Sequence, residues 1–173
     1  MAELGIRTVH VRLGHVIGDR SFVHDTHRID KKGRAFWSRI GSGEQWMPWI
    51  HVKDAVRLIK YVIENDNIRG VVNGVSPEAI RQKDFAEALK ATLPSKTLKI
   101  PMPETVAHWM YPKRAHLLLE GRKVIPRVAM ASDFVYSHPN IHDAMDSIRD
   151  TLIPVQWKNP VNTYFNPHSK DGL

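Results

Sequence analysis

The sequence has no cysteine among its 173 residues, so it holds no disulfide framework and offers no thiolate for catalysis. Long apolar runs are also missing, because no stretch reaches the roughly 20 residues that cross a bilayer. The first residues, Met1 to Gly5, show no basic region followed by an apolar block, which is the pattern of a signal peptide. We therefore expect a soluble, intracellular protein with no membrane partner, in a compartment that these residues do not indicate.

The composition is otherwise that of an ordinary globular protein with a basic surplus. Hydrophobic residues make up 42% of the chain and charged residues 25%, as in a soluble domain with one core. The formal net charge is +7, but the basic residues form no long block and acidic residues lie between them. Since no zinc-finger, RNP or helix-turn-helix pattern is present, a generally basic surface is favoured over nucleic-acid binding. A small ligand that carries phosphate would fit this charge equally well.

The most informative stretch is residues 40–54, which places glycines, a proline and two tryptophans before a helix. Glycine lets the backbone turn where a side chain would clash, and proline fixes φ and removes a donor. Trp49 supplies apolar area with one N–H that needs an acceptor. His51 and Asp54 follow at the start of the helix, where a carboxylate suits the positive end of the helix dipole.

Hydrophobic periodicity predicts the elements around this stretch. Alternation over residues 7–13 predicts a strand, and residues 71–75 read as a short buried strand. A helix is predicted over residues 52–64, with a stop at Gly70. Its apolar stripe is expected to consist of Val52, Ala55, Val56, Ile59, Val62 and Ile63.

The remainder of the chain is expected to be helical, with short extended pieces. Further helices are predicted at 84–93, 104–111, 114–120 and after Asn140, which caps the last one; an edge strand is predicted at 98–103 and a short strand at 134–136. The buried stripe of the last helix is expected to be Ile141, Ala144, Met145, Ile148 and Leu152. Residues after Pro154 show no periodicity and are expected to form a flexible tail.

Four motifs, in order, resemble the extended and atypical short-chain dehydrogenase/reductases, and more narrowly the epimerase-like SDR39U family. They are Val11-Arg12-Leu13-Gly14-His15-Val16-Ile17-Gly18, Gly41-Ser42-Gly43-x-Gln45 leading to Trp49-Ile50-His51-x-x-Asp54, Gly70-Val71-Val72-Asn73-Gly74-Val75-Ser76-Pro77, and Leu118-Leu119-Glu120-Gly121-Arg122-Lys123-Val124-Ile125-Pro126. Each motif alone is weak, but the four in the family's order and at similar spacing are specific. The resemblance covers roughly residues 5 to 150.

The resemblance implies an α/β fold, namely the C-terminal portion of a Rossmann-like reductase with a small α-rich domain on the substrate side. Residues 1–103 would be the remainder of the Rossmann-like core, 104–153 a small helical domain and 154–173 the tail. In such a fold Leu13, Gly14, His15 and Val16 would pass the nicotinamide of NADP or NAD. Trp49, His51 and Asp54 would organise the substrate-side wall.

The motifs that carry cofactor binding and catalysis in such reductases are absent. No G-x-x-G-x-x-G turn occurs, and no tyrosine begins a Y-x-x-x-K motif, in which the lysine lowers the tyrosine pKa. The N-terminal dinucleotide-binding half is therefore expected to be missing, and we assign no catalytic residue. We expect NAD(P) not to bind this chain alone, and whether the chain is itself an enzyme stays open.

Residues 19–39 depart from the family pattern, which leaves the substrate unknown. His24, Asp25, His27 and Asp30 are metal-ligating residue types. An H-x-x-H pair in a polar loop without a strong third ligand is more typical of a solvated segment, so we predict no metal site.

Two functions compete on this evidence. The chain is either a truncated or partial NAD(P)-dependent epimerase-like oxidoreductase, which supplies substrate-side structure, or a stand-alone, non-catalytic protein-binding module. In both, the expected partner is the missing N-terminal half or a homologous subunit. A basic nucleic-acid-binding domain is a weaker third alternative, and its binding would depend steeply on salt.

Overall fold

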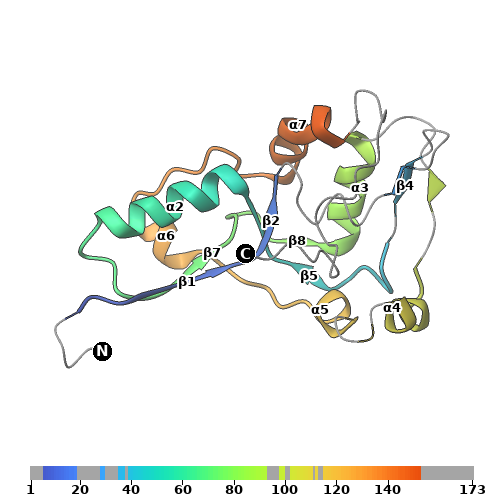
Figure 1. Ribbon diagram of the computed structural model, residues 1–173, viewed down its shortest axis with the longest axis horizontal. Helices are drawn as coiled ribbons and strands as arrows, with labels where there is room; N and C mark the ends of the chain where they lie inside the picture. Colours follow the sequence, from blue (N-terminus) through green and yellow to red (C-terminus); the bar gives the residue numbers. More distant parts are fainter. Residues whose placement is uncertain are drawn as a thin grey trace, which may run out of the picture.

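The computed structural model describes residues 6–18, 28–29, 35–37, 39–92, 98–99, 102–110, 112 and 115–152. In chain order the elements are β1 (Val9–Leu13), β2 (His15–Ile17), β3 (Arg28–Ile29), β4 (Ala35–Trp37), β5 (Trp46–Met47), β6 (Trp49–His51), α2 (Val52–Glu64), β7 (Gly70–Gly74), β8 (Ile80–Arg81), α3 (Gln82–Thr92), β9 (Leu98–Lys99), α4 (Glu104–Met110), α5 (Ala115–Leu119), α6 (Arg127–Ala131) and α7 (Ile141–Leu152) (Figure 1). The fold is α/β with parallel strands, as predicted. The expected tail and the four metal-ligating residue types of the 24–30 segment lie outside the described residues.

The first layer is a parallel pair of strands, β1 and β7, with α2 and α6 packed on one face (Figure 1). Val11 lies opposite Val72 in the register. Val72 belongs to one apolar cluster with Leu58 of α2, and Val11 packs against that cluster. The alternate residues, among them His10 and Val71, point to the other face because side chains alternate along a strand. Within the described residues, β7 is the only strand that pairs with β1.

Strands β1 and β7 separate at their carboxyl ends, where β6 lies between the two segments that follow them. Gly14 N still donates to Gly74 O at 3.0 Å, but the next amide, His15 N, donates to Pro48 O at 2.8 Å. On the other side Ser76 N donates to Trp49 O at 2.5 Å. A Cβ on Gly14 would lie 2.6 Å from Pro48 O, so glycine is required for this close backbone approach.

Helix α2 has the predicted bounds but does not bury the whole predicted stripe. Two members of the predicted stripe, Ala55 and Val62, face the sheet and are buried. Leu58, which was not part of the predicted stripe, is buried beside them. The other four members of the stripe are exposed: Val52, Val56, Ile59 and Ile63. The prediction of one fully buried stripe is therefore wrong, because the described part of the sheet beneath the helix is two strands wide and covers only part of the apolar surface of α2.

A second core lies between α3 and α7. Met145 and Ile148 of α7 pack with Phe85 and Leu89 of α3, and Trp49 of β6 joins the same cluster. Asn140 caps α7 as predicted, since its Oδ1 accepts from Asp143 N at 2.9 Å. Trp49 belongs to this core while its neighbour in β6, Ile50, belongs to the first, so β6 joins the two cores.

The segment after α5 differs from its prediction. Residues 134–136 were expected to form a strand, but they pair with no described strand, and the short helix α6 precedes them. Phe134 is buried in the cluster under α2, and Tyr136 Oη donates to Val75 O at 2.9 Å. Side-chain packing and this hydrogen bond therefore hold the segment in place of ladder hydrogen bonds.

The described helices are short. The longest, α2, has 13 residues, and none has both the length and the apolar character needed to cross a bilayer.

Candidate functional site

Two groups of candidate site residues meet in adjacent strands: residues 13–16, and the group of Trp49, His51 and Asp54. The two groups lie more than thirty positions apart in the sequence. In the parallel pairing of β2 with β6, His15 lies opposite Trp49, Val16 opposite Ile50 and Ile17 opposite His51. The carboxyl end of a parallel strand is where open α/β sheets bind ligands. Residues 13–16, the expected nicotinamide-side segment, thus run past the end of β1 directly beside the expected substrate-side segment.

The two groups differ in how far they reach the surface. Leu13 is 45% exposed, and Gly14, His15 and Val16 are partly buried. Burial lowers the pKa of the His15 imidazole below its usual value of 6.5, so the neutral form is favoured at this position. Trp49, in contrast, is buried.

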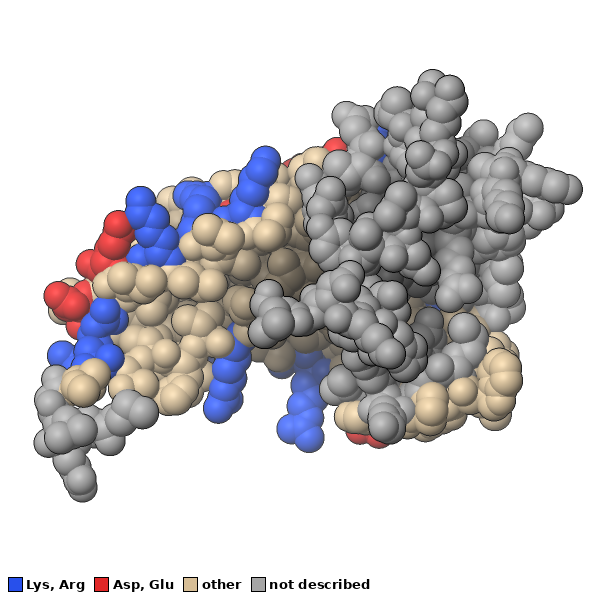
Figure 2. Space-filling view, viewed as in Figure 1, with Lys and Arg blue, Asp and Glu red and all other residues tan. Residues whose placement is uncertain are grey.

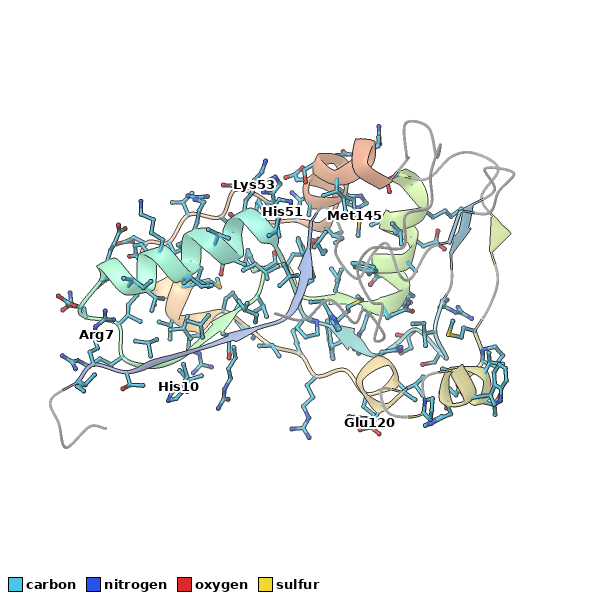
Figure 3. All side chains as sticks on the ribbon, viewed as in Figure 1. Arg7, His10, His51, Lys53, Glu120 and Met145 are labelled. Carbon is cyan, nitrogen blue, oxygen red and sulfur yellow. The ribbon has the colours of Figure 1, made fainter. Side chains whose placement is uncertain are left out.

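His51 connects the start of α2 to α7 (Figure 3). Its Nδ1 accepts from Lys53 N at 3.3 Å, which caps the helix, and its Nε2 lies 3.0 Å from Ser147 Oγ. Ser147 Oγ donates its own proton to Ala144 O at 2.7 Å, so it accepts from His51. The ring is therefore neutral, with its proton on Nε2.

Asp54 is fully buried and holds the chain segment that leads into α7. Its Oδ1 accepts from Ser137 N and its Oδ2 from His138 N, both at 2.8 Å, and Arg57 lies 3.3 Å from Oδ1. A carboxylate in the first turn of a helix also interacts favourably with the helix dipole. Asp54 thus fixes residues 137–138 against α2, and with them the entry to α7.

The His51 ring stacks on His138 with centroids 3.8 Å apart. Ser147, His51 and Asp54 are the residue types of a hydrolytic triad, but the His51 Nδ1, which would donate to the carboxylate in such a triad, here accepts from Lys53 N. His51 therefore cannot draw a proton from Ser147 in the way that such a triad requires.

Sequence reasoning did not identify His138, Ser137 or Ser147. These residues come from a loop and from the polar side of α7, where hydrophobic periodicity carries no information.

A shallow hollow lies beside the core between α3 and α7, to which its lining residues Met47 and Ile80 belong. Its lining consists of Trp46, Met47, Pro48, Ser76, Glu78, Ala79, Ile80, Arg122, Lys123 and Val124. The Arg81 guanidinium lies 3.6 Å from the Trp46 ring centroid, and Lys123 Nζ lies 4.9 Å from it. Two cationic side chains, Arg81 and Lys123, thus lie against the Trp46 ring, whose face is a favourable site for a cation.

No group of three or more metal-ligating side chains occurs within the described part of the chain.

Two family models match the sequence. The NAD dependent epimerase/dehydratase family matches residues 1–73, and a domain of unknown function, DUF1731, matches residues 102–148. Among curated proteins, the mouse epimerase family protein SDR39U1 is 37% identical over 143 residues, which are 82% of this chain and 48% of the mouse protein. Epimerase family protein YfhF of Bacillus subtilis is 29% identical over 145 residues, 84% of this chain and 47% of YfhF. The chain therefore spans about half the length of these relatives.

Among solved structures, that of human epimerase family protein SDR39U1 (isoform 2) with NADPH is similar. Its TM-score is 0.71 at 32% sequence identity, with 83% of this chain and 48% of the human chain covered.

Proposed function

This chain belongs to the NAD dependent epimerase/dehydratase family, and we propose that it forms the substrate-side half of an NAD(P)-dependent, epimerase-like oxidoreductase. The half that binds the dinucleotide would come from another segment or another chain. The observation that carries this proposal is the separation of β1 and β7 around β6. It places residues 13–16 at the carboxyl end of a parallel sheet, which is the ligand-binding edge of open α/β folds.

The residues at this edge fit one end of a dinucleotide. Leu13 offers a half-exposed apolar side chain at the end of β1, suited to the face of a flat nicotinamide ring. The amides of Gly14 and His15 already donate to Gly74 O and Pro48 O, so contact there would be through side chains. In the described ranges no glycine-rich turn leads from a strand into a helix, and β6 runs directly into α2. The phosphate end would therefore be held by the other half.

When bound, the nicotinamide would give or accept a hydride. The residues of this chain would orient the reactants. Trp49, His51 and Asp54 are buried, so they would support the substrate-side wall from behind instead of touching the substrate. The hydrogen bonds of His51 with Ser147, and of Asp54 with Ser137 and His138, fix β6 and α2 relative to α7.

A thermal melt with and without NADPH tests the proposal. A ligand at about 100 times its dissociation constant adds roughly 2.7 kcal/mol to a protein that binds it only when folded. We expect no shift for the 173-residue chain alone. We expect a shift when the chain is mixed with the part of human SDR39U1 that it does not cover. A shift for the chain alone, or none for the mixture, would contradict the proposal.

The second candidate is a stand-alone protein-binding module, which is favoured by the exposed apolar side of α2. This module would melt cooperatively, would bind no NADPH in either sample and would still capture a partner.

A further inference from the structure

The shallow hollow beside β5, which we call the Trp46 hollow, borders the expected nicotinamide-side segment. Its lining residue Pro48 accepts from His15 N at 2.8 Å. Ser76, which also lines it, follows the end of β7 and donates its N–H to Trp49 O. The hollow therefore lies at the carboxyl ends of β1 and β7, where a substrate beside the nicotinamide would sit.

Gly121 places a basic segment, Arg122 and Lys123, at the Trp46 hollow. A Cβ on Gly121 would lie 1.7 Å from Trp46 O, so glycine is required where this backbone passes β5. Lys123 Nζ then lies 4.9 Å from the Trp46 ring centroid. Figure 2 shows Lys and Arg side chains projecting from the lower edge of the molecule, where the segment between α5 and α6 runs in Figure 1. Backbone packing against β5 thus fixes the position of these cations.

The positive charges of this segment are not neutralised by the protein around them. Arg122 and Lys123 form no ion pair with any residue that the structure describes. Glu78 is the acidic residue of the lining, and its Oε2 accepts from the first amide of α7 at 2.6 Å. Ser76 Oγ donates to Pro139 O at 2.6 Å. Both of these polar side chains are therefore engaged by the segment that leads into α7, whereas the two cations remain available to a ligand.

A cationic ligand does not fit this hollow. The face of an indole ring attracts cations, but Arg81 and Lys123 already lie against the ring of Trp46. A further cation would meet their positive charges, whereas an anion would be attracted by them. The rest of the lining is largely apolar and includes Met47, Pro48, Ile80 and Val124. Apolar walls with a few polar groups in fixed positions are typical of small-molecule sites.

We propose that the Trp46 hollow binds the anionic group, a carboxylate or a phosphate, of the small substrate that the nicotinamide oxidises or reduces. Arg122 and Lys123 are its ligands, because guanidinium and ammonium groups donate strong hydrogen bonds to carboxylate and phosphate oxygens. Trp46 positions Lys123. The hollow is shallow, so it holds one group of the substrate while the remainder extends toward residues 13–16. This inference rests on the proposed function and adds the class of substrate.

A titration of the isotope-labelled 173-residue chain, followed by nuclear magnetic resonance, tests anion binding. The probes are inorganic phosphate and acetate, each at an ionic strength held constant with sodium chloride. The Trp46 indole N–H signal, identified with Trp46→Phe, reports on the hollow. We expect a saturating shift of this signal with phosphate or with acetate, and the tighter of the two identifies the group that the substrate carries. No saturating shift with either anion would overturn the inference.

Two double variants test which cations bind the anion. Arg122→Gln with Lys123→Gln should weaken binding at least about tenfold, because charge-assisted hydrogen bonds are lost. Both side chains are exposed, so the melting curve should not change. Lys53→Gln with Lys60→Gln is the matched control, since it removes two positive charges from exposed positions of α2 outside the lining; it should bind like the original chain. Equal weakening in both variants would show that the anion responds to net charge alone, and would overturn the inference.

NADPH also carries phosphates, so a melt with NADPH separates the inference from the proposed function. Mixed with the uncovered part of human SDR39U1, the Arg122→Gln, Lys123→Gln variant should gain the same stability from NADPH as the original chain. Loss of this gain in the variant alone would assign the hollow to the cofactor and overturn the inference. If the original mixture gained stability but the hollow bound no anion, the inference would be wrong and the proposed function would stand. If the hollow bound the anion but the original mixture gained no stability, the proposed function would be wrong, and with it the assignment of the anion to a substrate.

Discussion

Replacing Asp54 by Asn should destabilise the fold strongly without changing its shape. Asp54 Oδ1 and Oδ2 accept from Ser137 N and His138 N at 2.8 Å each. An asparagine offers one oxygen and one NH₂ group, so one of these amides would face another donor. A buried donor without an acceptor costs about 1–3 kcal/mol, and the remaining bond loses its charge-assisted strength. We expect a total loss of about 2–4 kcal/mol, or about 5–15 °C in melting temperature.

Urea unfolding measures this loss as a lower midpoint at an unchanged slope. Glu64→Gln is the control for removing a negative charge from the same helix, because Glu64 is exposed and forms a surface ion pair with Lys60; it should change stability by less than about 0.5 kcal/mol. Hydrogen exchange should also show faster opening at residues 137–138 in the Asp54→Asn variant. If that variant were as stable as the control, the role of Asp54 in fixing the entry to α7 would be refuted.

Three further predictions concern pH and packing. Burial, and then the charge of Asp54, raise the pKa of Tyr136 to about 12. The native state favours the neutral phenol, so Tyr136 contributes to the free energy of unfolding. This contribution is complete below the unfolded pKa of about 10 and is lost between about pH 10 and 12. Urea midpoints should fall over that range, and less steeply for Tyr136→Phe; equal slopes would contradict the shift. The lowered pKa of His15 affects stability on the acid side of the pH range. The contribution of His15 to the free energy of unfolding is complete above about pH 6.5 and is lost as the pH falls. His15→Gln should therefore flatten the decline on the acid side, and an unchanged decline would show that His15 does not cause it. Gly121→Ala would place a Cβ 1.7 Å from Trp46 O, so it should lower the urea midpoint by the equivalent of about 1–3 kcal/mol; an unchanged midpoint would mean that the Gly121 loop relaxes freely.

The local elements were largely predictable from the sequence. Alternation in β1 and the 3.6-residue period of α2 are strong local signals, and both elements form where predicted. The strand predicted at residues 134–136 is wrong because β-propensity does not reveal a missing strand partner. There Phe134 and Tyr136 are held by contacts with residues more than 60 positions away.

The candidate site was only partly predictable. Motif resemblance selected residues 13–16 and Trp49, His51 and Asp54, but it did not indicate that β2 and β6 pair in register. The distant partners of His51 and Asp54 lie in the 137–147 segment, and only the folded chain brings them together. The exposed half of the α2 stripe was missed because periodicity shows which residues share a helix face, whereas tertiary packing decides which part of that face is covered.

A crystal structure of the chain together with the uncovered half of human SDR39U1 and NADPH tests the central claim most directly. We predict the nicotinamide ring within van der Waals contact, about 4 Å, of the Leu13 side chain at the carboxyl end of β1, and the phosphates bound by the other half. A nicotinamide bound away from residues 13–16, or phosphates held by this chain, would contradict the account.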